Sequence, residues 1–371
     1  MRIGIDARLA TAPRTGIGSY TANLVAALGR IGGDERYVLF TDQPLAPLPG
    51  PAFANVVLPV PRRLVWTFAT LPRACRRARL DVFHGTTNFE VPAFAGCPLV
   101  ATVHDLIPLR FPAAVSRRFR WLFRGLIGRT IRAARRVITV SEFTRREILE
   151  RYPGAAGKVV AIPNGVDPAF SAAGDPEADR RVRERHGISR RYLLFVGVFE
   201  PRKNVPLLVD AFEILRHTRP EAADLQLALA GGSGWRGDAI AEGVRSRGLE
   251  PAVRLLGYVP DADLPALYRG ATLAVVPSQY EGFGLPAIEA MACGAPVLAS
   301  DAAALPETVG DAGELFTAGD PGLLARRMAE LAGSPGRLAD LRERGLRRAG
   351  EFTWERTAAR TLEVYREAAR R

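Results

Sequence analysis

One stretch of this sequence constrains its fold more than any other, residues 273–300, LAVVPSQYEGFGLPAIEAMACGAPVLAS. Its apolar start, 273–276, is typical of a strand that is buried on both faces of a parallel sheet. The turn EGFG at 281–284 has two glycines, which allow backbone conformations that other residues avoid, and Pro286 suits the first position of a helix. Another apolar run follows at 297–299. The stretch therefore predicts a strand, a glycine turn, a helix and a second strand.

Several polar groups meet at the start of this predicted helix. Its unpaired N–H groups and its dipole favour a phosphate. Glu281 in the turn and Glu289 in the first helical turn flank the same place. Because carboxylates repel phosphate, we expect them to accept hydrogen bonds from sugar hydroxyls. The structural alternative is that Glu289 complements the helix dipole and Glu281 caps the turn. A nucleotide-sugar carries both phosphates and hydroxyls, so the pattern favours a ligand of that class.

The segment EGFGLPAIEAMACGAPV resembles the E-x7-E signature of the GT4 family of retaining nucleotide-sugar glycosyltransferases. The resemblance extends over nearly the whole chain. It implies an α/β protein of the GT-B fold, in which two Rossmann-like, doubly wound parallel-sheet domains face a cleft. Within the family, the segments EPRKN at 200–204 and QYEGFGLP at 279–286 are most similar to bacterial mannosyltransferases that use GDP-mannose.

The sequence also indicates where the domains divide. A chain of 371 residues is long enough for two ordinary domains. The segment IPNGVD at 162–167 resembles the element at the family's domain junction, and a shift to Ala, Gly, Asp and Arg follows it. We expect an acceptor-binding domain at 1–170 and a nucleotide-sugar-binding domain at 171–350. The resemblance implies that a C-terminal helix, 351–371, packs back across the junction.

Three residues of the first domain are candidate site residues. Gly16 and Gly18 lie in a predicted glycine turn that opens a helix, where they either contact a ligand or only shape the turn. Thr21 replaces the third glycine of the dinucleotide fingerprint, which argues against a nicotinamide site. His104 follows a buried strand, 98–103, and ligands of open parallel sheets bind at the carboxyl ends of strands. The resemblance implies that His104 faces the donor sugar, and Asp105 is expected to hold the loop or to orient His104.

Two cations of the second domain are expected to bind the donor diphosphate. Arg202 and Lys203 follow the apolar strand 192–196 and precede a helix, and the family's basic pair at this element binds the diphosphate. With His104 and Glu281 they are the predicted catalytic residues. The remaining predicted donor contacts, beside Glu289 and the two glycines of the first domain, are Gly197, Gly231, Val259, Gly282, Phe283, Gly284 and Leu285.

The basic pair also bears on the mechanism. Because two cations can neutralise the leaving diphosphate, we expect neither a metal ion nor another cofactor. Asp261 and Asp263 are interpreted as a helix start and not as a metal-binding D-x-D motif. No motif marks a carboxylate nucleophile, with Glu281 as the exception to watch, so the leaving phosphate would accept the acceptor's proton on the same face of the sugar.

Charge points to an anionic partner. The formal net charge is +12, and residues 106–141 contain nine arginines and no acidic residue. Within them, 116–136 has an apolar stripe at helical spacing, which predicts an amphipathic basic helix. This helix either covers the sheet with a solvated outer face or docks on an anionic membrane surface, where a lipid-linked acceptor would lie. A nucleic acid is not expected as a partner.

The sequence suggests a cytoplasmic protein. It has no apolar run of membrane-spanning length, its N-terminus enters a strand directly without the features of a signal peptide, and its three cysteines have no metal-like spacing. If the basic helix docks, the protein would be peripheral at the inner face of the cell membrane.

These observations favour a hexosyltransferase that acts in surface polysaccharide synthesis, with GDP-mannose or another nucleotide-diphosphate hexose as donor and a glycan or lipid-linked acceptor. Two other classes stay open. An epimerase or a phosphorylase can use the same fold, and a non-catalytic basic protein that binds nucleotides or membranes would explain the charge.

Overall fold

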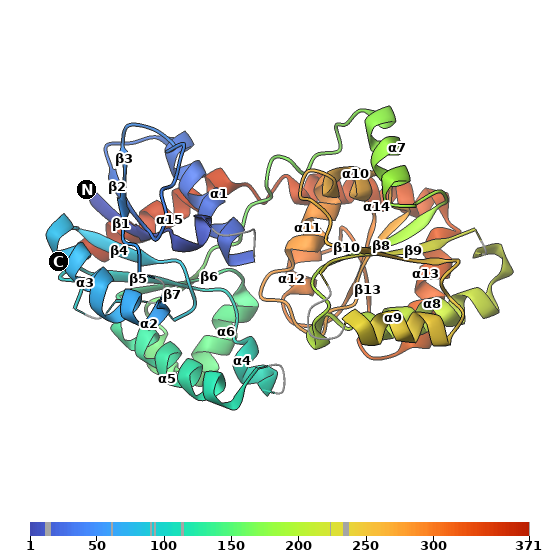
Figure 1. Cartoon of the computed structure of the whole chain (residues 1–371), viewed down its shortest axis with the longest axis horizontal. Helices are drawn as coiled ribbons and strands as arrows, with labels where there is room; N and C mark the ends of the chain where they lie inside the picture. Colours follow the sequence, from blue (N-terminus) through green and yellow to red (C-terminus); the bar gives the residue numbers. More distant parts are fainter. Residues whose placement is uncertain are drawn as a thin grey trace. The chain divides into compact units, whose positions relative to one another are not determined.

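The computed structural model forms two compact units (Figure 1). It describes residues 1–11, 16–60, 62–89, 91–92, 94–112, 115–222, 224–232 and 237–370. The first unit combines Met1–Gly165 with Phe352–Arg371, and the second is Val166–Glu351. The first unit thus ends a few residues before position 170, where the composition placed the boundary, and the C-terminal helix belongs to it.

The first unit is built on a parallel sheet of seven strands in the order β3-β2-β1-β4-β5-β6-β7. The strands are β1 (Arg2–Asp6), β2 (Arg36–Thr41), β3 (Phe53–Val57), β4 (Val82–Gly85), β5 (Leu99–Val103), β6 (Arg136–Thr139) and β7 (Val159–Ala161). Every residue of β5 is buried, as expected for an apolar run between two layers of helices. The strand order reverses between β1 and β4, so the carboxyl ends of these two strands form the topological switch point of the sheet.

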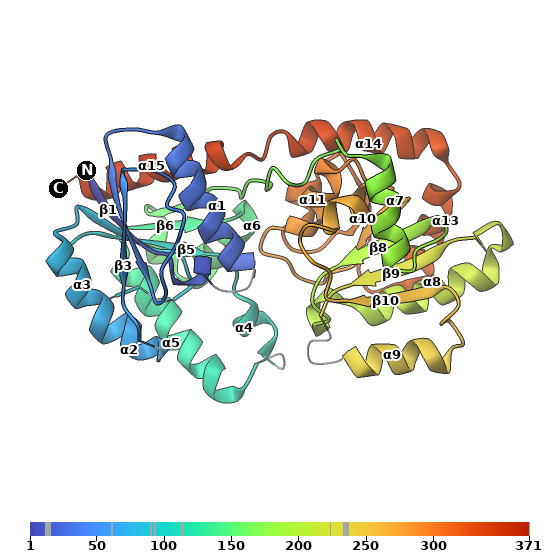
Figure 2. The same cartoon turned by 45° about the horizontal axis from the view of Figure 1, so that its top comes forward.

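Helices cover both faces of this sheet (Figure 2). They are α1 (Gly16–Ile31), α2 (Arg63–Val65), α3 (Leu71–Ala78), α4 (Ile107–Arg110), α5 (Arg117–Ala133), α6 (Glu142–Arg151) and α15 (Trp354–Ala369). A π-helical turn, Trp66–Thr70, joins α2 to α3. Helix α5 begins at the capping residue Ser116 and buries Phe123, Ile127 and Ile131, which recur at helical spacing. The amphipathic basic helix expected at 116–136 is therefore present.

The last helix, α15, packs against α1 and the central strands of the first unit. Its Trp354 is 2% exposed and its Tyr365 is fully buried. Thr357 donates a hydrogen bond from Oγ1 to the carbonyl of Pro163 at 2.7 Å. At Gly165, an added Cβ would lie 2.2 Å from the backbone nitrogen of Trp354. The glycine of the IPNGVD segment is therefore required by a close backbone approach.

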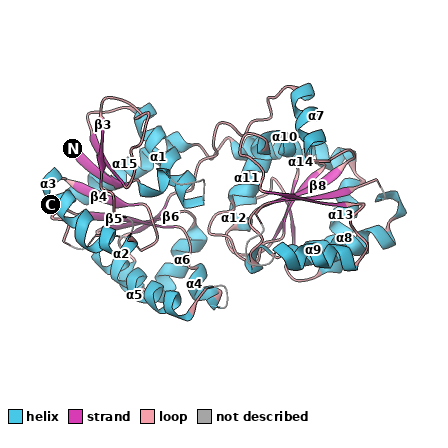
Figure 3. Ribbon diagram, viewed as in Figure 1, coloured by secondary structure: helices cyan, strands magenta, loops and turns pink. Residues whose placement is uncertain are grey.

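The second unit is built on a parallel sheet of six strands in the order β10-β9-β8-β11-β12-β13 (Figure 3). The strands are β8 (Tyr192–Val196), β9 (Gln226–Ala230), β10 (Val253–Gly257), β11 (Leu273–Val276), β12 (Val297–Ser300) and β13 (Glu314–Phe316). Its switch point lies between β8 and β11. Strand β11, the turn at 281–284, α11 and β12 form the strand, turn, helix and strand predicted for residues 273–300.

Helices also cover both faces of this second sheet. They are α7 (Pro176–Arg185), α8 (Val205–Thr218), α9 (Gly237–Ser246), α10 (Leu264–Gly270), α11 (Leu285–Ala292), α12 (Leu305–Val309), α13 (Pro321–Ala332) and α14 (Pro335–Ala349). Helices α8 and α13 pack together on one face, and α11 packs against α10 and α14 on the other. Among the described helices, none combines the length and the hydropathy that crossing a lipid bilayer requires.

Candidate functional site

The switch point of the second unit brings four polar side chains together, Arg202, Lys203, Ser278 and Glu281, which we call the Glu281 cluster. Arg202 and Lys203 lie in a 3-10 turn, Pro201–Lys203, between β8 and α8. Ser278 and Glu281 follow β11. Because β8 and β11 are neighbours in the sheet, their carboxyl ends place residues about eighty positions apart side by side.

Ion pairs connect the members of the cluster. Lys203 Nζ lies 2.6 Å from Glu281 Oε1, and each side chain is only 9% exposed. Arg202 Nη1 lies 3.1 Å from Glu281 Oε2, and its Nε lies 2.9 Å from Glu200 Oε2. The Ser278 hydroxyl donates to Glu281 Oε1 at 2.7 Å. Both oxygens of Glu281 therefore accept from cations, which makes this carboxylate an anchor for the basic pair.

The electrostatics of Glu281 favour its charged form. Burial raises the pKa of Glu281, but the charges of Lys203 and Arg202 and the hydrogen bonds from Lys203 and Ser278 outweigh it. The net pKa shift is downward. Glu281 is therefore ionised at neutral pH and keeps both cations beside it.

Two glycines form the backbone next to the cluster. Gly197 and Gly231 follow β8 and β9 with φ values of +153° and +157°. A Cβ on Gly231 would lie 2.0 Å from the carbonyl oxygen of Gly197, and one on Gly197 would lie 3.5 Å from Cε of Lys203. The close approach of the two strand ends thus requires glycine at position 231.

Helix α11 begins one residue earlier than the sequence suggested. Leu285 is its first residue, and Gly284, with φ +101°, is the residue before it. Among the described residues, no side chain caps this end. Glu289 consequently lies in the second turn of the helix, so the prediction of a first-turn position was wrong. Phe283 is buried, and its carbonyl accepts from the Thr308 hydroxyl at 2.5 Å.

Glu289 differs from Glu281 in its electrostatic surroundings. Burial raises the pKa of Glu289 to about 7, and the nearby charges of Asp167 and Asp261 act in the same direction. The hydroxyl of Tyr268 donates to Glu289 Oε2 at 3.4 Å and partly offsets this rise. The charge of Lys203 also lowers this pKa, which places Glu289 within electrostatic reach of the cluster. Glu289 can therefore change its charge near neutral pH.

Two further positions after β10 have simple structural settings. Val259 is 5% exposed in the loop that follows the strand. Asp263 precedes α10, as expected for a helix start, but its side chain does not cap the helix. Its carboxylate instead lies 3.0 Å from Arg185 and 2.9 Å from His186.

The first unit places His104 at the carboxyl end of β5. Its Nε2 lies 2.8 Å from the carbonyl of Thr86, and its backbone N–H donates to Asn88 Oδ1 at 2.7 Å. Because a carbonyl can only accept, Nε2 carries the ring hydrogen. Burial lowers the pKa of His104 to about 4, although the bond to Thr86 opposes this shift. At neutral pH the ring is therefore uncharged, with Nδ1 as a hydrogen-bond acceptor.

A buried network supports the His104 ring. Tyr20 meets this ring edge-on at a centroid distance of 4.7 Å, and its hydroxyl lies 3.0 Å from Thr102 Oγ1. His84 bridges Thr102 at 2.8 Å and the hydroxyl of Tyr365 at 2.7 Å. Burial lowers the pKa of His84 to about 3, so this histidine is also uncharged. The network ties helices α1 and α15 to the strand that ends at His104.

Gly16 and Gly18 do not form the turn that was predicted. Helix α1 already begins at Gly16, so Gly18 is its third residue and is buried. A Cβ on Gly16 would meet no atom within 4 Å. Residues 12–15, which precede the helix, lie outside the described residues.

The sequence reasoning missed Ser278 and Tyr268. Ser278 lies at the carboxyl end of β11, three positions before Glu281, and this placement at a strand end was the available signal. Tyr268 had no such signal because it lies inside α10 and meets Glu289 only through helix packing. Within the described part of the chain, no three His, Cys, Asp or Glu side chains are grouped to hold a metal ion.

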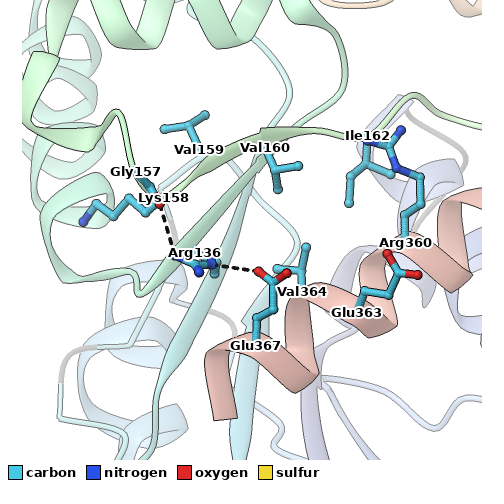
Figure 4. A pocket seen from close by; sticks show the side chains of 10 residues that line it. All are labelled: Arg136, Gly157, Lys158, Val159, Val160, Ile162, Arg360, Glu363, Val364 and Glu367. Carbon is cyan, nitrogen blue, oxygen red and sulfur yellow. Dashed lines mark hydrogen bonds and ion pairs between the residues drawn. The ribbon is translucent and has the colours of Figure 1, made fainter. Parts of the chain in front are cut away.

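A cavity of about 230 Å³ lies elsewhere in the first unit, between the edge strand β7 and helix α15 (Figure 4). Arg136 Nε forms an ion pair with Glu367 at 3.1 Å across it. Arg360 Nη2 donates to the carbonyl of Ala161 at 2.7 Å. These contacts hold α15 against the open edge of the sheet, so we assign the cavity to that packing.

Comparison with known proteins gives the same two-part division. Residues 14–170 match the family described as Glycosyltransferase Family 4, and residues 178–348 match Glycosyl transferases group 1. O-antigen chain mannosyltransferase B of Escherichia coli is 32% identical over 308 residues, which are 82% of this chain and 77% of that protein. The MMP alpha-(1->4)-mannosyltransferase of Mycolicibacterium hassiacum is 34% identical over 317 residues, 80% of this chain and 73% of that protein.

A solved structure agrees in fold. Anabaena HepE in complex with UDP-glucose superposes with a TM-score of 0.77 at 20% identity, covering 99% of this chain and 100% of that one. At this identity the likeness concerns the fold alone, which matches the two parallel-sheet units described above. With relatives above 30% identity over most of its length, the chain belongs to the GT4 glycosyltransferases and has their GT-B fold.

Proposed function

We propose that this protein transfers a hexose from a nucleotide-diphosphate sugar to a glycan or lipid-linked acceptor, with retention at the anomeric carbon. The observation that carries the proposal is the Glu281 cluster, in which a buried carboxylate holds Lys203 and Arg202 at a switch point. Two cations in this position can bind the donor diphosphate through charge-assisted hydrogen bonds, each contributing about 1.5–3 kcal/mol. Glu289, on the adjacent helix α11, would accept from the sugar hydroxyls.

The proposed mechanism follows from these positions. The bond between the anomeric carbon and the leaving phosphate oxygen breaks while the acceptor oxygen bonds to the same carbon on the same face. The acceptor's proton moves to the leaving phosphate, whose negative charge Lys203 and Arg202 stabilise. Glu281 does not act as the nucleophile in this scheme because both of its oxygens already bind cations. The catalytic role of His104 stays a prediction, in which its uncharged ring would accept a hydrogen bond through Nδ1.

We propose mannose as the transferred sugar and a surface polysaccharide as the product. The support is the activity for which two relatives are named, an O-antigen mannosyltransferase and an MMP mannosyltransferase. A thermal-shift screen of UDP- and GDP-sugars tests the donor, followed by a transfer assay with the sugar that stabilises the protein. GDP-mannose should raise the melting temperature most. An altered sugar-nucleotide formed without any acceptor would instead indicate an epimerase, and no stabilisation by any nucleotide would contradict donor binding.

We also propose that transfer needs no metal ion. The reason is the positive charge of Lys203 and Arg202. It can stabilise the negative charge of the leaving diphosphate, as a divalent cation would. Turnover should be nearly unchanged after treatment with a chelator. A large loss that Mg²⁺ or Mn²⁺ restores would contradict this part of the proposal.

A membrane surface is the proposed second partner, and helix α5 contributes one part of the docking face. Trp121 and Leu122 of this helix are 66% and 40% exposed. Leu64 and Val65 of α2 are 47% and 43% exposed. Residues 43–80 and 106–141, which contain α2, α3 and α5, have no Asp or Glu. Exposed apolar side chains among many arginines suit the interface of an anionic bilayer.

Contacts around Phe89 join the two parts of this face. The Arg63 guanidinium of α2 lies 5.3 Å from the Phe89 ring, which in turn lies 5.3 Å from the ring of Phe123 on α5. Arg129 of α5 lies 4.7 Å from the ring of Phe68, in the turn after α2. Figures 1 and 2 both show α2 beside α5. These contacts pack α2 and the turn after it against α5, so the two acid-free segments meet.

Vesicle sedimentation tests this docking. The protein should bind phosphatidylglycerol vesicles and not phosphatidylcholine vesicles. The pair Arg118→Gln and Arg124→Gln should weaken binding by roughly 2 kcal/mol, about thirtyfold, since each arginine near the surface contributes about 1 kcal/mol. The matched control, Arg190→Gln with Arg326→Gln, removes the same charge from exposed sites of the second unit. An equal loss in both pairs would mean that only net charge matters.

A further inference from the structure

Ser278 is the one member of the Glu281 cluster without a charge. It follows β11 after a single proline and is fully buried. Its hydroxyl donates to Glu281 Oε1 at 2.7 Å, the same oxygen that Lys203 Nζ approaches to 2.6 Å. The serine therefore shares an acceptor with the cation that faces the diphosphate in the proposed function.

The three donors to Glu281 differ in stiffness. Lys203 and Arg202 carry long side chains with several rotatable bonds, whereas Ser278 has a single χ angle and lies two residues after the end of β11. The Ser278 carbonyl accepts from the hydroxyl of Ser300 on β12 at 2.5 Å, a contact that does not involve the Ser278 hydroxyl. Ser278 is thus the least flexible of the three donors to the Glu281 carboxylate. By fixing the orientation of this carboxylate, it also fixes the positions of Lys203 and Arg202, which pair with it.

We infer that Ser278 is a positioning residue for transfer. Its hydroxyl holds Glu281 in the orientation that places Lys203 and Arg202 for the leaving diphosphate. This inference rests on the proposed function of the cluster. It requires no contact between Ser278 and the substrate.

The inference predicts a change in pH dependence. The charged groups that face Glu281 are Lys203 and Arg202, and Arg202 also pairs with Glu200. The hydrogen bond from Ser278 is one of the causes that lower the pKa of Glu281, so its loss raises that pKa. A carboxylate with a higher pKa takes up its proton at a higher pH and then releases its hold on Lys203. In Ser278→Ala, the acid limb of the pH–activity profile, where activity falls at low pH, should therefore shift to higher pH.

The experiment compares wild type, Ser278→Ala, Ser278→Thr and Ser300→Ala as full-length proteins. GDP-mannose and UDP-glucose serve as donor probes, with release of free sugar as the readout. Ser278→Ala should lower kcat about tenfold and leave the donor KM within about threefold of the wild-type value. It should also move the loss of activity at low pH to a higher pH. Ser278→Thr should restore most of the activity because it keeps the hydroxyl. Ser300→Ala removes an equally buried hydroxyl that does not touch Glu281, so its acid limb should stay in place.

A second measurement separates the inference from the proposed function. Carbon-13 NMR titration of the Glu281 carboxyl, assigned with Glu281→Gln, reports its pKa without any substrate. If wild type releases sugar from neither donor but Ser278→Ala still raises this pKa, the proposed donor chemistry fails while the contact stands. An unchanged Glu281 pKa, or an equal shift of the acid limb in Ser278→Ala and Ser300→Ala, would overturn the positioning role.

Discussion

Lys203 is the side chain whose loss should change the chemistry of this site most. The chain has only two lysines, Lys158 and Lys203, among 51 lysine and arginine residues. Lys203 occupies a buried space beside Gly197 and Glu281. The compact ammonium of a lysine fits this space better than the wider, planar guanidinium of an arginine. A lysine in this space can turn a third donor toward a phosphate while it stays paired with the carboxylate.

Lys203→Ala should therefore lower kcat by about a hundredfold or more, the cost of removing one preorganised donor from a developing charge. It should also destabilise the fold by about 3 kcal/mol, because Glu281 stays buried with one cation fewer. Steady-state kinetics and urea unfolding measure the two effects separately. Lys158→Ala is the control, since Lys158 donates to the carbonyls of Arg132 and Ala134 in the first unit, away from the Glu281 cluster. Wild-type turnover in Lys203→Ala would remove this residue from the phosphate site.

Glu289 should make sugar recognition depend on pH. Burial raises the pKa of Glu289 to about 7, and only the ionised carboxylate can accept hydrogen bonds with both oxygens. Affinity for the nucleotide-sugar should therefore rise with pH across about 6–8, with a midpoint near 7. Affinity for the nucleoside diphosphate alone should lack this limb because it carries no hexose.

Calorimetric titrations of both ligands over this pH range measure how affinity rises with pH. Glu289→Gln should abolish this rise for the nucleotide-sugar. The same raised pKa affects stability in the opposite direction. Between the unfolded pKa and about 7, the folded protein binds a proton that the unfolded chain releases, so stability falls as pH rises through this window. If affinity for the nucleoside diphosphate rose with pH as much as affinity for the nucleotide-sugar, the assignment of Glu289 to the sugar would be contradicted.

Position 231, where the ends of β8 and β9 approach each other, should not accommodate any side chain. Its φ of +157° disfavours other residues, and an added Cβ would lie 2.0 Å from the carbonyl oxygen of Gly197. Gly231→Ala should lower the free energy of unfolding by about 1–3 kcal/mol and separate the two strand ends, which weakens nucleotide binding. Gly232→Ala is the matched control because a Cβ there meets nothing within 4 Å. Equal stability and nucleotide affinity in the two variants would show that the strand ends can shift freely.

Buried strands and their helices were predictable from the sequence, and the side-chain pairing at their ends was not. Apolar runs located β5 and β11, because strands covered on both faces show no alternation. The edge strand β3 at Phe53–Val57 leaves a weaker pattern, because most of its residues are partly exposed. Gly16 and Gly18 suggested a turn, yet helix packing at this point overrides the low helix propensity of glycine.

The candidate site shows the same limit. The sequence placed Arg202 and Lys203 after one apolar strand and Glu281 in a turn after another, and the family resemblance assigned all three to the donor site. The sequence did not predict that Glu281 pairs with both cations or that Ser278 donates to it. Both contacts depend on which strands are neighbours at the switch point. The contact of Tyr365 with His84 spans 281 positions and follows from no local pattern.

The chain passes twice between its two units, and its last segment completes the first one. Tyr365 of α15 is fully buried, its hydroxyl lies 2.7 Å from His84 Nδ1, and the rings of these two residues meet at 5.4 Å. The first unit therefore depends on residues that are made after the whole second unit. The six-stranded sheet of the second unit contains no part of α15.

Tyr365→Ala should lower the stability of the first unit by about 3–5 kcal/mol, as expected for removing a large buried ring. Tyr365→Phe should cost only about 1 kcal/mol, because it loses the hydrogen bond to His84 and keeps the packing. Nucleoside diphosphate binding should survive in both variants, since the Glu281 cluster lies in the second unit. Hydrogen exchange resolved by peptide distinguishes the units, with faster exchange expected in β4 and β5 and unchanged protection in β8 and β11. Faster exchange spread evenly over both sheets would mean that the two units unfold as one.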